Sequence, residues 1–250
     1  MYYPTSEEEK KYIENYNADK YEKPSVTADI VIFTLSETNE LSILLIKRKD
    51  FPYKDRWAVP GGFVAINESL DEAASRELKE ETGLENIPIE QFATFGTVDR
   101  DPRMRIIAVA YMAFVPKSTL NFREDDDASD TQIFKINIDI DGLTLVGDRN
   151  VVKSDDLAFD HAEIIKTAIK RLRNRIEYTD DAFKFLKNDQ SFTIYELKKI
   201  YETVTGKAED TGNFRRGFLN KYVKTGLVVD TKEKTTNSGH RQASLYRKLH

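Results

Sequence analysis

The segment with the clearest chemical pattern carries three glutamates, Glu77, Glu80 and Glu81, at the spacing of one helical face. Residues three and four positions apart on a helix are neighbours, so these carboxylates should lie together. Clustered carboxylates repel one another unless a cation joins them. Mg²⁺ prefers such hard oxygen ligands, and substrate phosphate oxygens can complete its coordination shell. The pattern therefore predicts a Mg²⁺ site at which a water molecule attacks phosphorus.

The glutamates belong to a longer pattern of fixed positions between Gly62 and Leu84. Arg76 lies one turn before Glu80 and is expected to hold that carboxylate in place. Gly61 and Gly62 allow the backbone to turn sharply or to approach phosphate groups closely. The remaining fixed or apolar positions are Glu68, Leu78 and Gly83. A solvated acidic helix would explain the glutamates alone, but not so many fixed positions in one window.

The elements that must position these residues follow from hydrophobic patterning. Residues 69–82 have helical character, and Gly83 supplies the C-terminal stop. A short polar helix is expected at 6–16. Apolar runs rich in β-branched and aromatic residues predict strands at 26–35, 41–49, 57–64, 91–99, 105–115 and 131–138. This mixture over about 150 residues predicts an α/β sandwich.

Charge divides the chain into two parts. Residues 161–250 carry a net charge of +8, whereas residues 1–160 carry −13. Such asymmetry predicts two domains with different partners, an acidic one suited to a metal and a basic one suited to nucleic acid. A long amphipathic helix at 157–176, with Asp160 as its expected N-cap, should connect them. The domains are therefore expected at 1–156 and 177–250.

The basic part has the element order of a winged helix-turn-helix. Helical patterns at 179–187, 193–205 and 211–225 precede two apolar runs that flank a polar stretch, as in a β-hairpin. In the third helix an aromatic residue recurs every four positions and should face the core, at Phe214, Phe218 and Tyr222. The residues left free to meet duplex DNA are Asn213, Arg215 and Arg216 on that helix, and Lys232, Lys234, His240 and Arg241 on the wing.

Composition excludes several classes of protein. No apolar run approaches the roughly 18–20 residues needed to span a bilayer, and the acidic N-terminus does not read as a signal peptide. The absence of cysteine excludes disulfides, thiolate zinc sites and cysteine nucleophiles. We therefore expect a cytoplasmic protein without a membrane partner.

Between Gly62 and Leu84 the chain resembles the Nudix hydrolase superfamily, whose box it matches without a departure. The resemblance implies an α/β/α sandwich that uses Mg²⁺ or Mn²⁺ to hydrolyse a nucleoside diphosphate linked to another moiety. It implies that Glu77, Glu80 and Glu81 are metal ligands and that Arg76 orients them. The general base stays open among Glu80, Glu81 and an acidic loop that contains Glu124, Asp126 and Asp127, which a solvated turn would also explain.

Residues 95–116 are similar to a segment of ADP-ribose pyrophosphatases and of regulators related to them. Within it, Arg100 and Arg103 can grip phosphate or ribose oxygens through forked hydrogen bonds, or can pair with acids in a surface turn. Tyr53 and Trp57 can stack on an adenine, although a tryptophan in this apolar run is more typical of a core.

The basic part together with the Nudix box resembles the Nudix-related transcriptional regulators, over about residues 21–250. That family implies a dimeric DNA-binding repressor whose Nudix domain senses ADP-ribose or a related metabolite; some members regulate sugar utilisation. Many members carry a decayed box, whereas this box is intact. We therefore expect a regulator that retains hydrolysis. The alternative is an ADP-ribose pyrophosphatase with an accessory winged helix. His161 is expected to be structural at the start of the connector helix.

Overall fold

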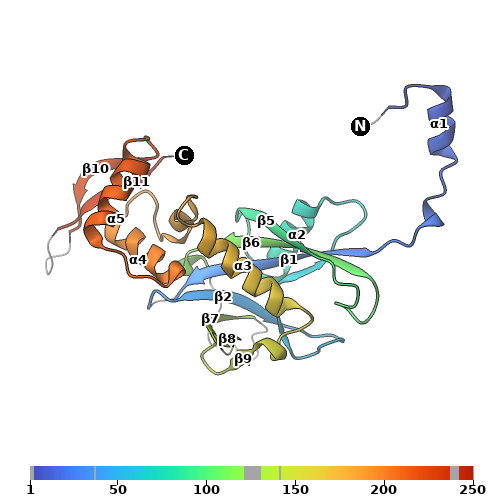
Figure 1. The fold of residues 1–250 in the computed structure, drawn as a ribbon, viewed down its shortest axis with the longest axis horizontal. Helices are drawn as coiled ribbons and strands as arrows, with labels where there is room; N and C mark the ends of the chain where they lie inside the picture. Colours follow the sequence, from blue (N-terminus) through green and yellow to red (C-terminus); the bar gives the residue numbers. More distant parts are fainter. Residues whose placement is uncertain (1–2, 37, 121–130, 141, 237–241, 250) are drawn as a thin grey trace.

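A mixed β-sheet forms the body of the N-terminal part of the chain (Figure 1). The computed structural model describes residues 3–36, 38–120, 131–140, 142–236 and 242–249. Within these residues nine strands pair in the order β5-β6-β1-β2-β7-β8-β9, with β3 added to β2 and β4 added to β1. The strands are β1 Ser25–Leu35, β2 Leu41–Lys47, β3 Trp57–Ala58, β4 Gly61–Phe63, β5 Ile89–Phe95, β6 Ile106–Phe114, β7 Thr131–Asp139, β8 Gly142–Val146 and β9 Val151–Lys153.

The centre of the sheet is the parallel pair of β1 and β6, in register from Ser25 opposite Ile106 to Phe33 opposite Phe114. Both strands are buried along most of their length, as expected for continuous apolar runs that are covered on two faces. Each predicted run contains a strand, but the run at 57–64 forms two short strands, β3 paired with β2 and β4 paired with β1, and the run at 91–99 ends as a strand at Phe95. β8 and β9 were not predicted, because they are only five and three residues long.

One helix covers each face of the sheet, so the predicted α/β/α sandwich is confirmed. α2 spans Leu70–Thr82 and begins with a capping box between Ser69 and Glu72. Gly83, at φ 72°, ends it in the left-handed conformation. α3 spans His161–Arg175 and lies on the opposite face, where it crosses the sheet in Figure 1.

The expected connector helix over 157–176 is shorter in the structure than in the prediction. α3 begins at His161, because Leu157 is extended in a β-bridge with Trp57 and Phe159 has a positive φ of 49°, and neither conformation continues a helix. Asp160 occupies the N-cap position of α3, as predicted, but its side chain makes no capping hydrogen bond. Its carboxylate instead binds the Arg100 guanidinium, a charge-assisted pair that competes with the cap.

The C-terminal part folds as the predicted winged helix domain (Figure 1). The first expected helix is a 3₁₀ segment, η4 Asp181–Phe185, rather than an α-helix. α4 Ile194–Thr205 follows with a capping box at Thr193. α5 Thr211–Phe218 starts at the N-cap Asp210 and runs into a π-helical turn, η5 Leu219–Val223. The hairpin of β10 Val228–Lys234 and β11 Ser244–Lys248 forms the wing.

The remaining helical elements are short. α1 Glu7–Glu14 buries no residue and stands away from the sheet in Figure 1. The other 3₁₀ turns are η1 Ala18–Lys20, η2 Lys117–Thr119 and η3 Ser154–Asp156. Among the described residues, no helix is long and apolar enough to cross a membrane.

A single apolar core joins the sheet to the winged helix domain. It contains sheet residues, the buried face of α3, both phenylalanines of η4 and the helices α4 and α5. Phe185 packs edge-on against Phe114 of β6, with ring centroids 5.4 Å apart. Phe183 packs in the same way against Tyr222, at 4.9 Å. The two domains therefore share one core across η4.

We predict that Leu172→Ala lowers the free energy of unfolding by about 2–5 kcal/mol, because Leu172 on α3 is fully buried in this shared core. Urea denaturation, with fluorescence of Trp57 for the sheet and hydrogen exchange of α4 for the winged helix domain, measures the effect. Both probes should shift together. Ile13→Ala on exposed α1 is the control and should change stability by less than about 0.5 kcal/mol. A shift in only one probe would contradict a shared core.

Candidate functional site

Two glycines bring the strand β4 against the helix α2. A Cβ atom at Gly62 would lie 2.3 Å from Oε1 of Glu77, so only glycine leaves room for that carboxylate. Gly61 has a φ of 154°, and a Cβ there would lie 2.4 Å from the Ala28 carbonyl oxygen of β1. Gly61 requires glycine because its neighbours are backbone atoms, whereas a side chain at position 62 would displace the Glu77 carboxylate. The close approach places the loop directly beside the glutamates.

Arg76 gathers the carboxylates of the box. Its Nε and one terminal nitrogen donate to Glu68, at 3.0 and 2.7 Å. The other terminal nitrogen donates to Glu77 at 2.6 Å and to Glu80 at 3.1 Å. These bonds, with the Ala65 amide, hold the pKa of Glu68 down at about 2. The expected contact between Arg76 and Glu80 is therefore present.

The third glutamate lies deeper in the site than Glu80. Glu81 accepts a 2.6 Å hydrogen bond from the amide of Gly61. Burial raises its pKa to about 7, and the neighbouring Glu77 and Asp29 carboxylates contribute to that rise. Burial also raises the pKa of Asp29, under the same loop, to about 6. The site is thus a concentration of negative charge that is partly removed from water.

These residues fit a divalent cation by chemistry, because the donors are hard carboxylate oxygens and Gly62 leaves the Glu77 carboxylate the space it needs. Within the described ranges, no three carboxylate or imidazole side chains converge on one point as a formed metal site would. Arg76 and the Gly61 amide hold the carboxylates instead.

Arg100 lies inside the protein rather than in a surface turn. Its side chain is 4% exposed and binds Asp160 through two hydrogen bonds, at 2.9 and 2.6 Å. Its guanidinium also lies 3.6 Å from the Asp29 carboxylate. Arg100 therefore ties β1 to the residue before α3, and its contact with a ligand stays a prediction.

Phe159 and Arg48 form a feature that the sequence analysis missed. The Phe159 ring lies 4.8 Å from the Arg48 guanidinium and 5.8 Å from that of Arg103. Phe159 has a φ of 49°, a left-handed conformation that is strained for an aromatic residue and is found at ligand clamps. Burial, followed by the charge of Arg103, lowers the pKa of Arg48. The sequence signal for this feature was the pair of basic residues Arg48 and Lys49 directly after β2.

Arg103 is half-exposed at the edge of this group. It binds Asp101 through two side-chain hydrogen bonds, at 3.0 and 2.8 Å, and its guanidinium lies over the Phe63 ring next to Gly62. Arg103 therefore lies beside the box, and its role in ligand binding stays a prediction.

The two aromatic candidates for adenine stacking differ in position. Trp57 packs edge-on against Phe134, with ring centroids 4.8 Å apart, so the core interpretation is confirmed. Tyr53 contacts Phe159, at 4.8 Å. His161 is structural, as expected: its Nδ1 accepts a 3.0 Å hydrogen bond from the Val59 amide. Burial lowers the pKa of His161 to about 3, so the ring is neutral.

The predicted DNA-binding residues of the third helix are exposed on α5. Phe218 and Tyr222 of the same helical run are buried, which confirms the predicted orientation of that run. Arg216 donates to the Asn213 side chain at 2.9 Å. Arg215 is exposed on the same helix, and the wing residues Lys232 and Lys234 are exposed on β10. The loop candidates Glu124, Asp126 and Asp127 and the wing candidates His240 and Arg241 lie outside the described residues.

Comparison with known families agrees with this geometry. The model of the NUDIX domain matches residues 24–138, and the model of the NrtR DNA-binding winged helix domain matches residues 182–248. The fold and the site thus define a Nudix domain joined to a DNA-binding winged helix domain.

Similar proteins cover both domains. The chain is 34% identical to the ADPR responsive transcriptional repressor NtrR of Acinetobacter baylyi, over 96% of this chain and 88% of that protein. It is 36% identical to an ADP-ribose pyrophosphatase of Methanocaldococcus jannaschii, over 63% of this chain and 82% of that protein. The chain belongs to the NrtR family of Nudix-related transcriptional regulators.

Solved structures resemble the whole chain. A MutT/nudix family protein from Enterococcus faecalis superposes with a TM-score of 0.75 at 29% identity, over 99% of this chain and 100% of that one. NrtR of Shewanella oneidensis, solved with a 27mer DNA, superposes with a TM-score of 0.68 at 29% identity, over 90% and 93% of the two chains. Both likenesses include the winged helix domain.

We predict that Gly61→Ala lowers the free energy of unfolding by about 1–3 kcal/mol, because the new Cβ would meet the backbone of β1 at a φ that alanine rarely adopts. Gly217→Ala is the matched control: it lies in α5 with open space around it, and should stabilise by about 0.5–1 kcal/mol through helix propensity. Thermal unfolding of both variants gives the comparison. Equal stability of the two variants would show that β4 does not need glycine.

Proposed function

We propose that this regulator binds duplex operator DNA through its winged helix domain and responds to ADP-ribose, or a related nucleoside diphosphate compound, bound by its Nudix domain. The observation that carries the proposal is an intact Nudix box in one chain with a winged helix whose third helix exposes Arg215 and Arg216. A sugar-utilisation regulator that senses a different metabolite is the second reading that the family allows.

The chemistry beside the box supports a nucleotide ligand. Arg48 and Arg103 supply positive charge that suits a diphosphate, and the Phe159 ring between them suits an aromatic base. The Arg103 guanidinium lies over the Phe63 ring, and the Phe63 carbonyl accepts a hydrogen bond from Arg76, so this group adjoins the box. The similar proteins from A. baylyi and M. jannaschii are named for ADP-ribose, which supports that choice of nucleotide.

We further propose that the Nudix domain hydrolyses its ligand. Glu77, Glu80 and Glu81 would hold Mg²⁺ or Mn²⁺, which supplies charge neutralisation at the diphosphate and an activated water. Arg76 orients Glu77 and Glu80 by direct hydrogen bonds, and the Gly61 amide orients Glu81. Glu80 and Glu81 remain the described candidates for the general base.

A Mg²⁺-dependent ADP-ribose pyrophosphatase with an accessory winged helix is the alternative from a different class. The intact box and the similarity to an ADP-ribose pyrophosphatase favour it. Substitutions distinguish the two functions. In an enzyme with an accessory domain, changes in the box would lower the activity, whereas changes on α5 would have no functional effect.

The proposed DNA complex is a homodimer. α5 would lie in the major groove, because its exposed Arg215 and Arg216 precede the buried Phe218. A two-fold symmetric protein reads a two-fold symmetric sequence, so we expect a palindromic operator with half-sites about one helical turn apart.

We predict Mg²⁺-dependent cleavage of ADP-ribose to AMP and ribose 5-phosphate, followed as AMP release over time. Glu80→Gln and Glu81→Gln should each lower kcat by about 10²-fold or more, as expected when a metal ligand or base is removed. Glu85→Gln is the matched control, since this exposed carboxylate pairs with Lys79 just outside the box. If the wild-type chain turns over no nucleoside diphosphate compound with Mg²⁺ or Mn²⁺, the box serves binding alone.

We predict that Arg215→Ala and Arg216→Ala each weaken operator binding by about 1–3 kcal/mol if they contact bases. Lys234→Ala should mainly lower the salt dependence, by about one unit of slope. Lys79→Ala removes the same charge from α2 and should leave DNA affinity unchanged.

Mobility-shift titration with and without ADP-ribose measures these effects, with Glu81→Gln to stop turnover. The ligand shifts DNA affinity only if it binds the DNA-free and DNA-bound arrangements unequally. Binding to random DNA at low salt alone, unaffected by the ligand, would leave the Nudix enzyme with an accessory domain.

A further inference from the structure

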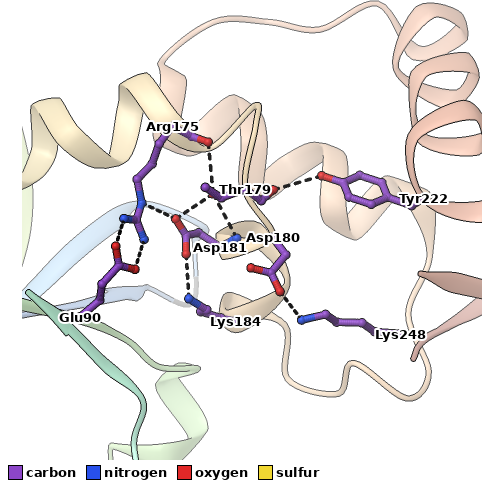
Figure 2. Close-up of polar contacts among 8 residues, drawn as sticks. All are labelled: Glu90, Arg175, Thr179, Asp180, Asp181, Lys184, Tyr222 and Lys248. Carbon is purple, nitrogen blue, oxygen red and sulfur yellow. Dashed lines mark hydrogen bonds and ion pairs between the residues drawn. The ribbon is translucent and has the colours of Figure 1, made fainter. Parts of the chain in front are cut away.

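A buried carboxylate lies where α3 meets the winged helix domain. Asp181, the first residue of η4, is 1% exposed. It accepts hydrogen bonds from Nε of Arg175 at 2.6 Å, from Nζ of Lys184 at 2.8 Å and from Oγ1 of Thr179 at 2.8 Å (Figure 2). A buried charge is tolerated only when it is paired and hydrogen-bonded, so these contacts hold the residues after α3 in one conformation.

The Arg175 guanidinium is shared between the two domains. Its terminal nitrogens donate to both carboxylate oxygens of Glu90, at 2.5 and 2.7 Å, while its Nε binds Asp181 (Figure 2). Glu90 lies on β5, at the edge of the Nudix sheet. The planar fork of arginine can bind two carboxylates at fixed angles, which lysine cannot do. Arg175 therefore fixes the start of the winged helix domain relative to the sheet.

The same short segment also contacts the wing and the third helix. Asp180 accepts a 2.5 Å hydrogen bond from Nζ of Lys248 on β11. The carbonyl of Thr179 accepts a 3.3 Å bond from the Tyr222 hydroxyl, which lies in the π-helical turn after α5 (Figure 2). Residues 179–181 thus form a joint, bonded to the sheet through Arg175 and to the DNA-binding elements through Tyr222 and Lys248.

The other end of α3 is bonded to the ligand site. Arg100 binds Asp160, and Nδ1 of His161 accepts a hydrogen bond from the Val59 amide. Val59 is two residues before Gly61, whose amide binds Glu81. α3 is 15 residues long, or about 22 Å. A continuous set of hydrogen bonds and one packed helix therefore connects the Nudix box with the joint, the kind of network that can carry coupling.

The contacts of the joint differ in how easily they can open. Opening the bonds to Asp181 would leave a charge buried without its partners. The Glu90 side chain is 51% exposed, so its carboxylate can return to water when it leaves Arg175. Exposed ion pairs contribute little net stability. Asp180 is equally exposed in its pair with Lys248, but that pair lies within the winged helix domain. The Glu90–Arg175 pair is the exposed contact between the joint and the sheet, and it can break while the rest of the joint persists.

We propose that the joint at residues 179–181 sets the orientation of the winged helix domain, and that the Glu90–Arg175 pair is its releasable contact, through which the state of the Nudix site changes DNA affinity. The second half of this proposal rests on the proposed function. Arg175 and Glu90 act as positioning residues, since they lie away from both ligand and DNA contacts.

The test uses the full-length chain with Glu90→Gln, which keeps the side-chain shape but removes the charge that binds Arg175. The chain has no cysteine, so Lys54→Cys and Lys207→Cys, both at exposed positions, place one spin label on each domain without competition. Dilution with unlabelled chain leaves one labelled protomer in each dimer. We expect Glu90→Gln to broaden or shift the distance distribution, and Arg175→Lys to act in the same direction because it loses the fork.

The second readout is the ratio of DNA Kd with and without ADP-ribose. Glu90→Gln should move this ratio towards 1 by about two- to fivefold, the range for loss of one exposed ion pair. By the reciprocity of coupling, the ratio of ADP-ribose Kd with and without DNA should move towards 1 by the same factor. Glu85→Gln is the matched control, because that carboxylate is 55% exposed and pairs with Lys79 without touching the winged helix domain. It should leave both readouts at wild-type values.

Two failures can be told apart. Wild-type distances and a wild-type ratio in Glu90→Gln would overturn the proposal, because the pair would then be an ordinary surface contact. A wild-type chain whose DNA affinity ignores ADP-ribose would overturn the proposed function instead. In that case the distance distributions of the spin labels would still test whether the joint sets the orientation of the winged helix domain.

Discussion

Burial of one face of α3 against the sheet is the packing on which both functional regions depend. The apolar residues on this face of α3 are at most 1% exposed: Ile164, Ile165, Ala168, Ile169 and Leu172. The helix cannot rotate or slide without exposing that face, at about 25 cal/mol for each Å² of apolar surface. Phe159 at its start and Asp181 beyond its end are therefore placed by the same contact. The Nudix site and the winged helix domain are therefore both positioned by α3.

Within the Nudix site, electrostatics and space act together. The glycine loop must lie close to α2 for the Gly61 amide to reach Glu81, and that closeness removes the carboxylates from water. Burial raises the pKa of Glu81, while Arg76 offsets the repulsion among the other glutamates through direct bonds. The arrangement concentrates negative charge and keeps it hydrogen-bonded, which is how a cation site can persist in a stable fold.

Sequence reasoning succeeded where local rules decide the structure. The helix of the box follows from the helical pattern over 69–82 and the stop at Gly83, and the structure has it at Leu70–Thr82. It failed where partners are distant in sequence. Arg100 binds a residue sixty positions away, and Arg175 binds one eighty-five positions away. Such pairs depend on tertiary register, which no local pattern encodes. The same limit hid the Arg48–Phe159 contact and left η4 as an expected α-helix.

The apolar core that continues through η4 limits how this two-domain architecture can evolve. Domains joined by a flexible tether can be exchanged between proteins as separate modules. Here Phe185 packs on Phe114 of the sheet, so a transplanted winged helix would carry an uncovered apolar surface. Its new host would have to present a matching aromatic pocket. The DNA-reading half and the Nudix half are thus inherited most easily as a pair, and substitutions at their boundary must compensate one another.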